Sequence, residues 1–221
     1  GRKKLQILNH LHDHRAMTTK PGLYRSMTRY YEKFGLNPHH VLPETFLVLS
    51  SRSNDPGWSA FASRFKEIAS QNYVNLDMPI KQCTKNMWIV KPPDSNQGRG
   101  IRVFRSLSKI KKFVSASSNP SEIRTEGREW VVQKYLESPM LLWGRKFDLR
   151  IWVLVTPDDD ICVYRQGYLR TSSSTFTTEV QHGDPDGKTS GFVHLTNFCM
   201  QKNSPSVGKY EDGNTLSYDQ F

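Results

Sequence analysis

The strongest constraint on the fold is a series of short apolar segments between residues 87 and 170. Residues 87–90, 100–104, 129–136, 148–155 and 160–170 are rich in the aromatic and β-branched residues that favour strands, as are residues 45–49. Residues 157–160 predict a hairpin turn, whereas residues 22–36, 58–70 and 107–116 predict helices. The apolar stripe of the first helix, which includes Leu23, Tyr30 and Phe34, is expected to pack in the core. Residues 171–191, rich in Ser, Thr, Gly and Asp, predict a loop. This order indicates an α+β or mixed α/β domain rather than a bundle or a sandwich.

Composition indicates a basic protein without a disulfide framework, but it does not identify a function. The chain has 221 residues and a formal charge of +10, which would attract a polyanion such as a nucleic acid, a nucleotide or an acidic peptide. Its three cysteines are too few and too far apart to predict a disulfide framework or a zinc ribbon. We find no apolar run long enough to span a bilayer and no signal peptide, so no membrane association is expected. We also expect the sequence to be a fragment.

The segment GRKFDLRIWVLV, residues 144–155, combines charges with an apolar run. In a strand, Lys146, Asp148 and Arg150 would share one face, while Phe147 and the apolar positions alternating with it would occupy the other. The charged face is either solvated or lines a polar cleft, and the apolar half is expected to anchor the strand in a core. A cleft that binds phosphates would need such cations together with a carboxylate that positions them.

Two further segments have features of a nucleotide site. In WIVKPPDSNQGRGIRVF, a strand ends at Lys91 and a glycine-bearing loop follows, which could cover phosphates or be an ordinary surface hairpin. It matches neither a Rossmann fingerprint nor a P-loop. In EWVVQKYL, the strand ends at Gln133 and Lys134, where backbone groups could meet a purine edge; a plain strand end is the alternative.

Taken together, four ordered segments resemble the tubulin tyrosine ligase-like family of ATP-grasp ligases. They are WIVKPPDSNQGRGI, WVVQKYLESPMLLWGRKFDLRIWVLV, YRQGYLRTSS and HLTNFCMQK, and residues 18–47 match more loosely. The resemblance implies an α+β, ATP-grasp-like fold with mixed or antiparallel sheets, flanking helices and an incomplete C-terminal part. It divides the chain into the end of an N-terminal lobe (1–17), a central domain with the phosphate-covering loop (18–136) and the first part of a C-terminal domain (137–221).

The resemblance also implies an activity. The implied enzyme is an ATP-dependent ligase that adds glutamate or tyrosine to carboxylates of tubulin C-terminal tails through an acyl-phosphate intermediate. The expected partners are tubulin or microtubules and a free amino acid, in the cytoplasm and on the cytoskeleton, the cilium and basal body included. A noncatalytic nucleotide- or microtubule-binding module is the alternative, and nucleic-acid binding is not expected.

The resemblance assigns roles to single positions. Arg150, Arg170 and His194 are the implied catalytic residues; Arg170 and Lys20 are implied to contact substrate. The implied ATP-binding residues are Lys91, Gln97, Arg99, Gly100, Ile101, Gln133, Lys134, Tyr135, Leu136, Lys146, Phe147, Asp148, Thr196 and Asn197.

The Mg²⁺ ligands that the resemblance implies, an Asp and a Glu-x-Asn pair, have no counterpart here. Glu211 and Asn214 have the wrong spacing, so no metal ligand is assigned and the ligands are expected beyond residue 221.

Overall fold

The computed structural model describes residues 10–49, 55–70, 85–93, 95–116, 129–179 and 188–221. Its helices are α1 (Arg15–Thr18), α2 (Lys20–Lys33), α3 (Pro56–Ala69), α4 (Leu107–Ala116), α5 (Lys188–His194) and α6 (Phe198–Gln201), with short 3₁₀ helices η1 (Pro38–His40), η2 (Asp212–Asn214) and η3 (Tyr218–Gln220). Its strands are β1 (Thr45–Leu49), β2 (Trp88–Lys91), β3 (Arg102–Phe104), β4 (Glu129–Lys134), β5 (Leu141–Leu142), β6 (Arg145–Arg150), β7 (Val153–Val155), β8 (Ile161–Val163), β9 (Tyr168–Thr175) and β10 (Thr215–Ser217). No helix in these ranges is long and apolar enough to cross a membrane.

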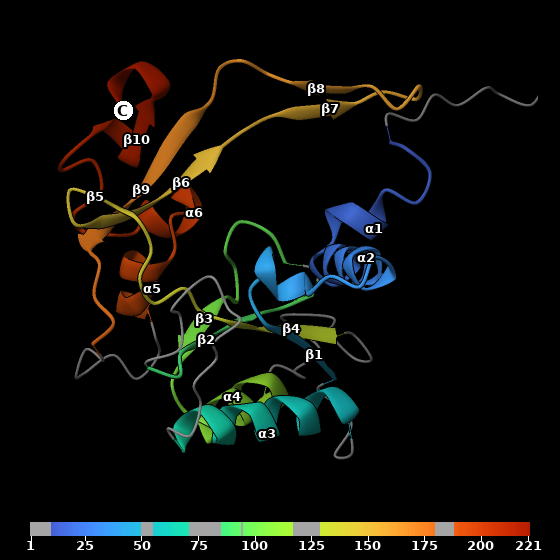
Figure 1. Ribbon diagram of the computed structural model, residues 1–221. Coiled ribbons are helices and arrows are strands. Elements are labelled where there is room, and N and C mark those ends of the chain that lie inside the picture. The colour runs from blue at the N-terminus through green and yellow to red at the C-terminus, as the bar shows by residue number, and fades with distance from the viewer. Residues whose placement is uncertain (1–9, 50–54, 71–84, 94, 117–128, 180–187) are drawn as a thin grey trace, which may run out of the picture.

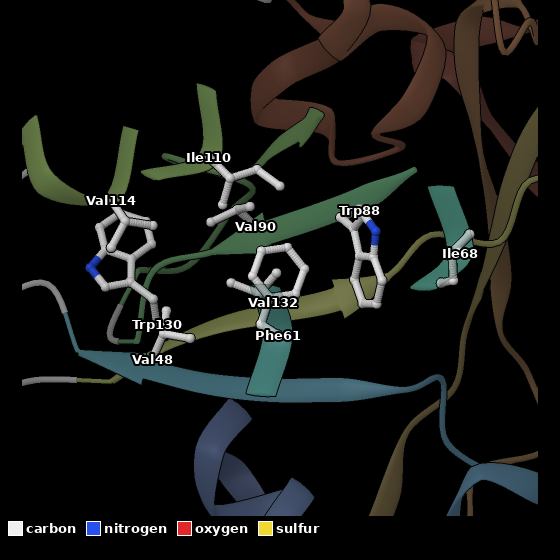
Figure 2. Packing of buried hydrophobic residues seen from close by; sticks show 9 residues of the cluster. All are labelled: Val48, Phe61, Ile68, Trp88, Val90, Ile110, Val114, Trp130 and Val132. Atoms are coloured by element: carbon white, nitrogen blue, oxygen red, sulfur yellow. The ribbon is translucent and has the colours of Figure 1, made fainter. Parts of the chain in front are cut away.

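The first sheet carries the main hydrophobic core. Its strand order is β1-β4-β2-β3 with antiparallel pairings, and α3 and α4 lie along one face (Figure 1). Because side chains alternate along a strand, this face receives every second residue. Figure 2 shows the resulting cluster, in which strand and helix side chains interdigitate: Val48, Phe61, Ile68, Trp88, Val90, Ile110, Val114, Trp130 and Val132. Asp55 caps α3 by accepting a hydrogen bond from the backbone N–H of Trp58 at 3.0 Å.

The same alternation sends a different set of side chains to the opposite face of this sheet. Thr45, Lys91 and Gln133 lie there, out of phase with the core residues of β1, β2 and β4. Gln133 accepts a hydrogen bond from Lys91 Nζ at 2.7 Å and donates one from Nε2 to Thr45 Oγ1 at 2.9 Å. The burial of one apolar face thus positions a polar one.

A second sheet forms the other half of the molecule. Its order is β10-β9-β6-β5, again antiparallel, with α5 and α6 beside it (Figure 1). Buried polar groups hold it together: Arg145 pairs with Glu211 through two hydrogen bonds of 2.8 and 2.7 Å. The short segment after β4 connects the two sheets. The mixture of helices and antiparallel strands confirms the α+β prediction, while the ATP-grasp assignment and the three-part division stay predictions.

Helices 22–36, 58–70 and 107–116 all form, as α2, α3 and α4. Helix α2 does not bury its stripe, however: Leu23, Tyr30 and Phe34 are 42%, 57% and 58% exposed, so their expected role in the core is wrong. A 3–4 spacing specifies an amphipathic helix but not whether another element covers its apolar face.

The segment 148–155 differs from the sequence prediction. The strand breaks after Arg150, and β7 pairs with β8 in a separate hairpin that extends away from the second sheet (Figure 1). Trp152 and Leu154 are 49% and 62% exposed, so the apolar half does not enter a core. The turn predicted at 157–160 is confirmed by the pairing of β7 with β8 and by the hydrogen bond from Thr156 N–H to Asp160 C=O at 3.0 Å.

The prediction of a loop over residues 171–191 is also wrong in part. Residues 171–175 continue strand β9, and residues 188–194 form α5, while 180–187 lie outside the described residues. Thr171, Ser172 and Ser173 are buried because neighbouring polar groups satisfy their hydroxyls and backbone.

Candidate functional site

Three lysines from three elements converge on the polar face of the first sheet. Lys20 begins α2 and donates hydrogen bonds to the carbonyls of Pro92 at 3.1 Å and Ser95 at 2.6 Å, which places it against the loop after β2. Lys91 ends β2, and Lys146 reaches toward the same region from β6. These ammonium groups lie close enough to perturb one another electrostatically.

The electrostatics of this cluster are unfavourable without a counter-ion. Burial, then repulsion from Lys20, lowers the pKa of Lys91 to about 8. Burial and then Lys91 lower the pKa of Lys146 to about 8, against an opposing effect of Asp148. Burial also lowers the pKa of Lys20. Half-buried cations that repel one another form a site for an anion with several charges, because such a ligand restores the stability of the protonated amines.

The glycine-bearing loop predicted to cover phosphates is placed beside this cluster. Two backbone hydrogen bonds shape it, from Arg99 N–H to Asn96 C=O at 3.0 Å and from Ile101 N–H to Gly98 C=O at 3.2 Å. Gly98 has φ +81° and packs so close to Asn197 that an added Cβ would lie 2.9 Å from its Oδ1. The loop therefore depends on glycine here and contacts the segment containing Thr196 and Asn197.

Tyr135, Lys146 and His194 meet where the two sheets join. Lys146 Nζ donates to the Tyr135 hydroxyl and to the His194 carbonyl, both at 3.1 Å, and the Tyr135 hydroxyl lies 3.0 Å from His194 Nδ1. Burial, and then the charges of Lys146 and Arg105, lower the pKa of His194 to about 4. The imidazole is therefore neutral at physiological pH.

Asp148 and Arg170 face each other across β6 and β9. The Arg170 guanidinium donates to both carboxylate oxygens of Asp148, from Nε at 3.0 and 3.2 Å and from Nη2 at 2.6 Å. Arg150 lies farther along β6, where its backbone pairs with β9, and its exposed side chain has no hydrogen bond or ion pair to any residue that the structure describes. Phe147 points to the other side of β6, where its ring packs 5.6 Å from that of Phe221.

The segment at the end of β4 and just after it, residues 133–136, is predicted to contact adenine, and buried hydrogen bonds hold it in place. Lys134 is 1% exposed and donates to Glu137 Oε1 at 2.6 Å, and the same carboxylate oxygen accepts from Met87 N–H at 2.9 Å. The backbone N–H groups of Lys134 and Tyr135 bond to Glu44 C=O at 2.7 Å and Met87 C=O at 3.0 Å. Leu136 is 38% exposed. A ligand arriving here would meet the exposed Leu136 rather than the Lys134 ammonium.

The structure thus brings most of the predicted site residues to one region. Hydrogen bonds join Lys91 to Gln133, and join Lys146 to Tyr135 and His194, while electrostatic repulsion links Lys91 to Lys20 and to Lys146. Gly98 connects the loop of Gln97, Arg99, Gly100 and Ile101 to Asn197. Asp148, Arg150 and Arg170 follow along β6 and β9. The side chains of Lys134 and Phe147 are turned away, into the protein and onto Phe221 respectively.

Sequence reasoning missed several residues that support the site. Arg105, just after β3, has buried Nε and Nη2 atoms without a hydrogen-bond partner among the described residues, and its charge lowers the pKa of His194. Gln201 is fully buried and joins α6 to β9 by accepting from Ser173 N–H at 2.8 Å. Burial alone would raise the pKa of Glu211, but hydrogen bonds from Arg145 and Thr171 outweigh it and lower that pKa. Arg105 and Gln201 are polar residues in an ordinary sequence context, which gave no signal. The sequence analysis considered Glu211 only as a metal ligand and missed its pairing with Arg145.

The described residues contain no group of three or more His, Cys, Asp or Glu side chains suited to a metal ion. Glu211 is held by Arg145, and the Asn214 amide donates to Thr171 C=O at 3.2 Å and to Ser173 Oγ at 3.1 Å. Both side chains therefore have structural partners. The residues described do not by themselves fit a Mg²⁺ site.

Comparisons with known proteins show which family the chain belongs to. A sequence model described as the Tubulin-tyrosine ligase family matches residues 2–220. The chain is 29% identical over 227 residues to a probable alpha-tubulin polyglutamylase, Ttll1, of Tetrahymena thermophila, covering 95% of this chain and 48% of that protein. It is 32% identical to the human tubulin monoglycylase TTLL3, over 66% of this chain and 20% of the relative. It is 40% identical to the Drosophila melanogaster tubulin glycylase 3A, over 58% and 11% respectively.

The chain spans about half or less of the length of these curated relatives. The family match extends over almost every residue, including both sheets and the lysine cluster between them. The chain therefore belongs to the tubulin-tyrosine ligase family.

Proposed function

We propose that this chain supplies the nucleotide-binding part of an ATP-dependent ligase that adds an amino acid to carboxylates of tubulin C-terminal tails. The observation that carries the proposal is the convergence of Lys20, Lys91 and Lys146. Burial lowers the pKa of all three amines, and repulsion from a neighbouring lysine lowers the pKa of Lys91 and of Lys146 further. A triphosphate has the charge and the length to contact all three. The curated relatives, named as a polyglutamylase and as glycylases, support tubulin as the acceptor.

The proposed reaction forms an amide in two steps. The acceptor carboxylate takes the γ-phosphoryl group of ATP and releases ADP; the amine of the free amino acid then attacks the acyl carbon and expels phosphate. The three lysines would neutralise the phosphates, and the loop over residues 95–101 would exclude water, which otherwise hydrolyses the acyl phosphate. Mg²⁺, supplied with the nucleotide as MgATP, would neutralise further phosphate charge when bound.

Arg170 and Arg150 are the proposed contacts for the substrate carboxylates. Asp148 occupies Nε and Nη2 of Arg170 and so fixes the orientation of the guanidinium. Arg150 lies two residues after Asp148 on β6, and its exposed guanidinium suits bidentate binding of a carboxylate. Because tubulin tails are acidic, the +10 charge of the chain would also attract the acceptor, and the cytoskeleton is the proposed location of the activity.

The added amino acid is proposed to be glutamate or tyrosine, with glycine as the third donor to test because two of the relatives named above are glycylases. The test incubates the complete protein with MgATP, tubulin and each labelled amino acid, and locates the product by mass spectrometry. Tubulin stripped of its C-terminal tails is the control acceptor. Lys146→Ala should abolish incorporation, whereas Lys109→Ala, on the exposed face of α4, should not.

Failure to incorporate any of the three amino acids would refute the proposed ligase. If MgATP nevertheless binds, the noncatalytic nucleotide-binding alternative would be supported instead. Incorporation into tail-stripped tubulin would contradict the proposed acceptor.

A further inference from the structure

The hydrogen bonds among Tyr135, Lys146 and His194 indicate which atoms of these side chains carry protons. The three residues come from the segment after β4, from β6 and from the end of α5, so none of their contacts is a local one. Tyr135 and His194 are 2% and 8% exposed, and the Phe176 ring packs against the imidazole with centroids 5.9 Å apart. Water therefore has little access to the hydrogen bonds among them.

The direction of each hydrogen bond follows from which groups are able to donate. A protonated Lys146 ammonium has no acceptor, so at 3.1 Å it must donate to the oxygen of Tyr135. The hydroxyl proton of Tyr135 is then directed at its other neighbour, His194 Nδ1, at 3.0 Å. Nδ1 must accept, which places the single imidazole proton on Nε2. The depressed pKa of His194 agrees with a neutral ring.

We propose that Tyr135 and His194 are positioning residues, which orient the Lys146 ammonium toward the triphosphate through the relay Lys146 to Tyr135 to His194. This inference rests on the proposed function for the identity of the ligand. His194 then acts through Tyr135 and Lys146 rather than as an acid or base in the reaction. Its backbone carbonyl adds a second acceptor for Lys146, at 3.1 Å, so α5 fixes the ammonium from two sides.

The relay should control the protonation of Lys146. The charged groups that act on this amine are Lys91 from β2 and Asp148 from β6, while Arg105, after β3, acts on His194. Tyr135→Phe removes a hydrogen-bond acceptor that stabilises the ammonium form. The pKa of Lys146 should therefore fall further, and affinity for ATP should decline at a lower pH than in the wild type.

The test measures MgATP affinity of the complete protein by calorimetry between pH 6.5 and 9. Tyr135→Phe should weaken binding about tenfold near pH 8 and less at pH 6.5, because one charge-assisted hydrogen bond is lost. His194→Asn can place its amide oxygen near the position of Nδ1 and retain an acceptor for the Tyr135 hydroxyl, so it should weaken binding less than His194→Ala, which should resemble Tyr135→Phe. Tyr164→Phe is the matched control, since Tyr164 is 60% exposed and follows β8.

A second readout does not depend on ATP. Spectra of protein labelled with ¹⁵N-histidine, with the His194→Asn variant assigning the signal, should show the Nε2–H tautomer down to about pH 5, and Tyr135→Phe should move the Nδ1 resonance. An Nδ1–H tautomer would overturn the relay, and so would a Tyr135→Phe variant whose ATP affinity follows the wild-type pH dependence. If the wild type binds no MgATP, the proposed function fails, while the tautomer still decides whether the relay exists.

Discussion

Replacing Lys91 with methionine should make the ligand-free protein more stable while it destroys the binding site. The reason is that burial and the nearby Lys20 charge lower the pKa of Lys91 from 10.5 to about 8. At about 1.4 kcal/mol per pKa unit, keeping this amine protonated at pH 7 costs about 3 kcal/mol relative to the unfolded chain. Methionine has a similar length and no charge, so the substitution removes that penalty.

The gain is reduced by the hydrogen bond that is lost. Gln133 Oε1 accepts from Lys91 Nζ at 2.7 Å, and leaving this partly buried oxygen without its donor costs about 1 kcal/mol. The net stabilisation should be about 2 kcal/mol, or roughly 4–8 °C in Tm for a chain of this size. Because Lys91 also lowers the pKa of Lys146, the gains from replacing both lysines should not be additive.

The same reasoning fixes the sign of the pH dependence. Between about pH 8 and 10.5 the unfolded chain still holds a proton on Lys91 that the folded protein has released, so the free energy of unfolding should rise with pH. In this window, Lys91 and Lys146 should each contribute about 1.4 kcal/mol per pH unit to the rise in the free energy of unfolding. The Lys91→Met protein should lack the contribution of Lys91.

Urea unfolding at pH 7 and pH 9.5, followed by circular dichroism, measures both effects. Lys109→Met on α4 is the matched control, because the Lys109 side chain is exposed, and its stability should stay close to that of the wild type at each pH. Two results would refute the account of a destabilised cation cluster. One is a Lys91→Met protein that is less stable than the wild type at pH 7; the other is a free energy of unfolding that rises between pH 7 and pH 9.5 by as much in Lys91→Met as in the wild type.

Three further substitutions test other parts of the site. Gly98→Ala, strained at φ +81° and placing its Cβ 2.9 Å from Asn197 Oδ1, should weaken MgATP binding at least about tenfold while Tm falls by only a few degrees; unchanged affinity would contradict the proposed loop function. Glu137→Ala should destabilise the protein by about 3–5 kcal/mol in urea unfolding, because it leaves a buried ammonium unpaired, and a loss under 1 kcal/mol would contradict this. Arg105→Ala should raise the pKa of His194 in an NMR titration, and an unchanged or lower pKa would show that the charge of Arg105 does not act there.

Local patterns predicted the elements of the first sheet because several signals agreed. The helix over 107–116 forms with those same bounds as α4, and strand 45–49 forms as β1. In both cases the apolar period, the residue types and the flanking turns favour the same structure, and the core face then follows from alternation along the strands. Lys91 could be placed near a site for the same reason, since it ends a strand whose alternate residues are buried.

The exposed hairpin could not be predicted, because an apolar run specifies a strand but not what covers it. Trp152 and Leu154 belong to such a run and yet are 49% and 62% exposed, since β7 pairs only with β8. The strand over 171–175 was not predicted, for the opposite reason: its Ser and Thr residues are typical of loops. They are buried only because Gln201, Arg145 and Asn214 supply hydrogen bonds from distant parts of the chain. Contacts of this range leave no local pattern.

The two faces of the first sheet connect stability with binding. Trp88 and Val90 bury one face of β2, and this fixes the direction in which Lys91 must project. The core can hold Lys91 beside Lys20 and Lys146 only because it stabilises the fold by more than the cluster destabilises it. An anion that contacts all three amines recovers that free energy on binding, so the cost of burying these charges contributes to affinity for a polyphosphate. If Lys91→Met is more stable and binds no MgATP, both consequences will have been observed in one protein.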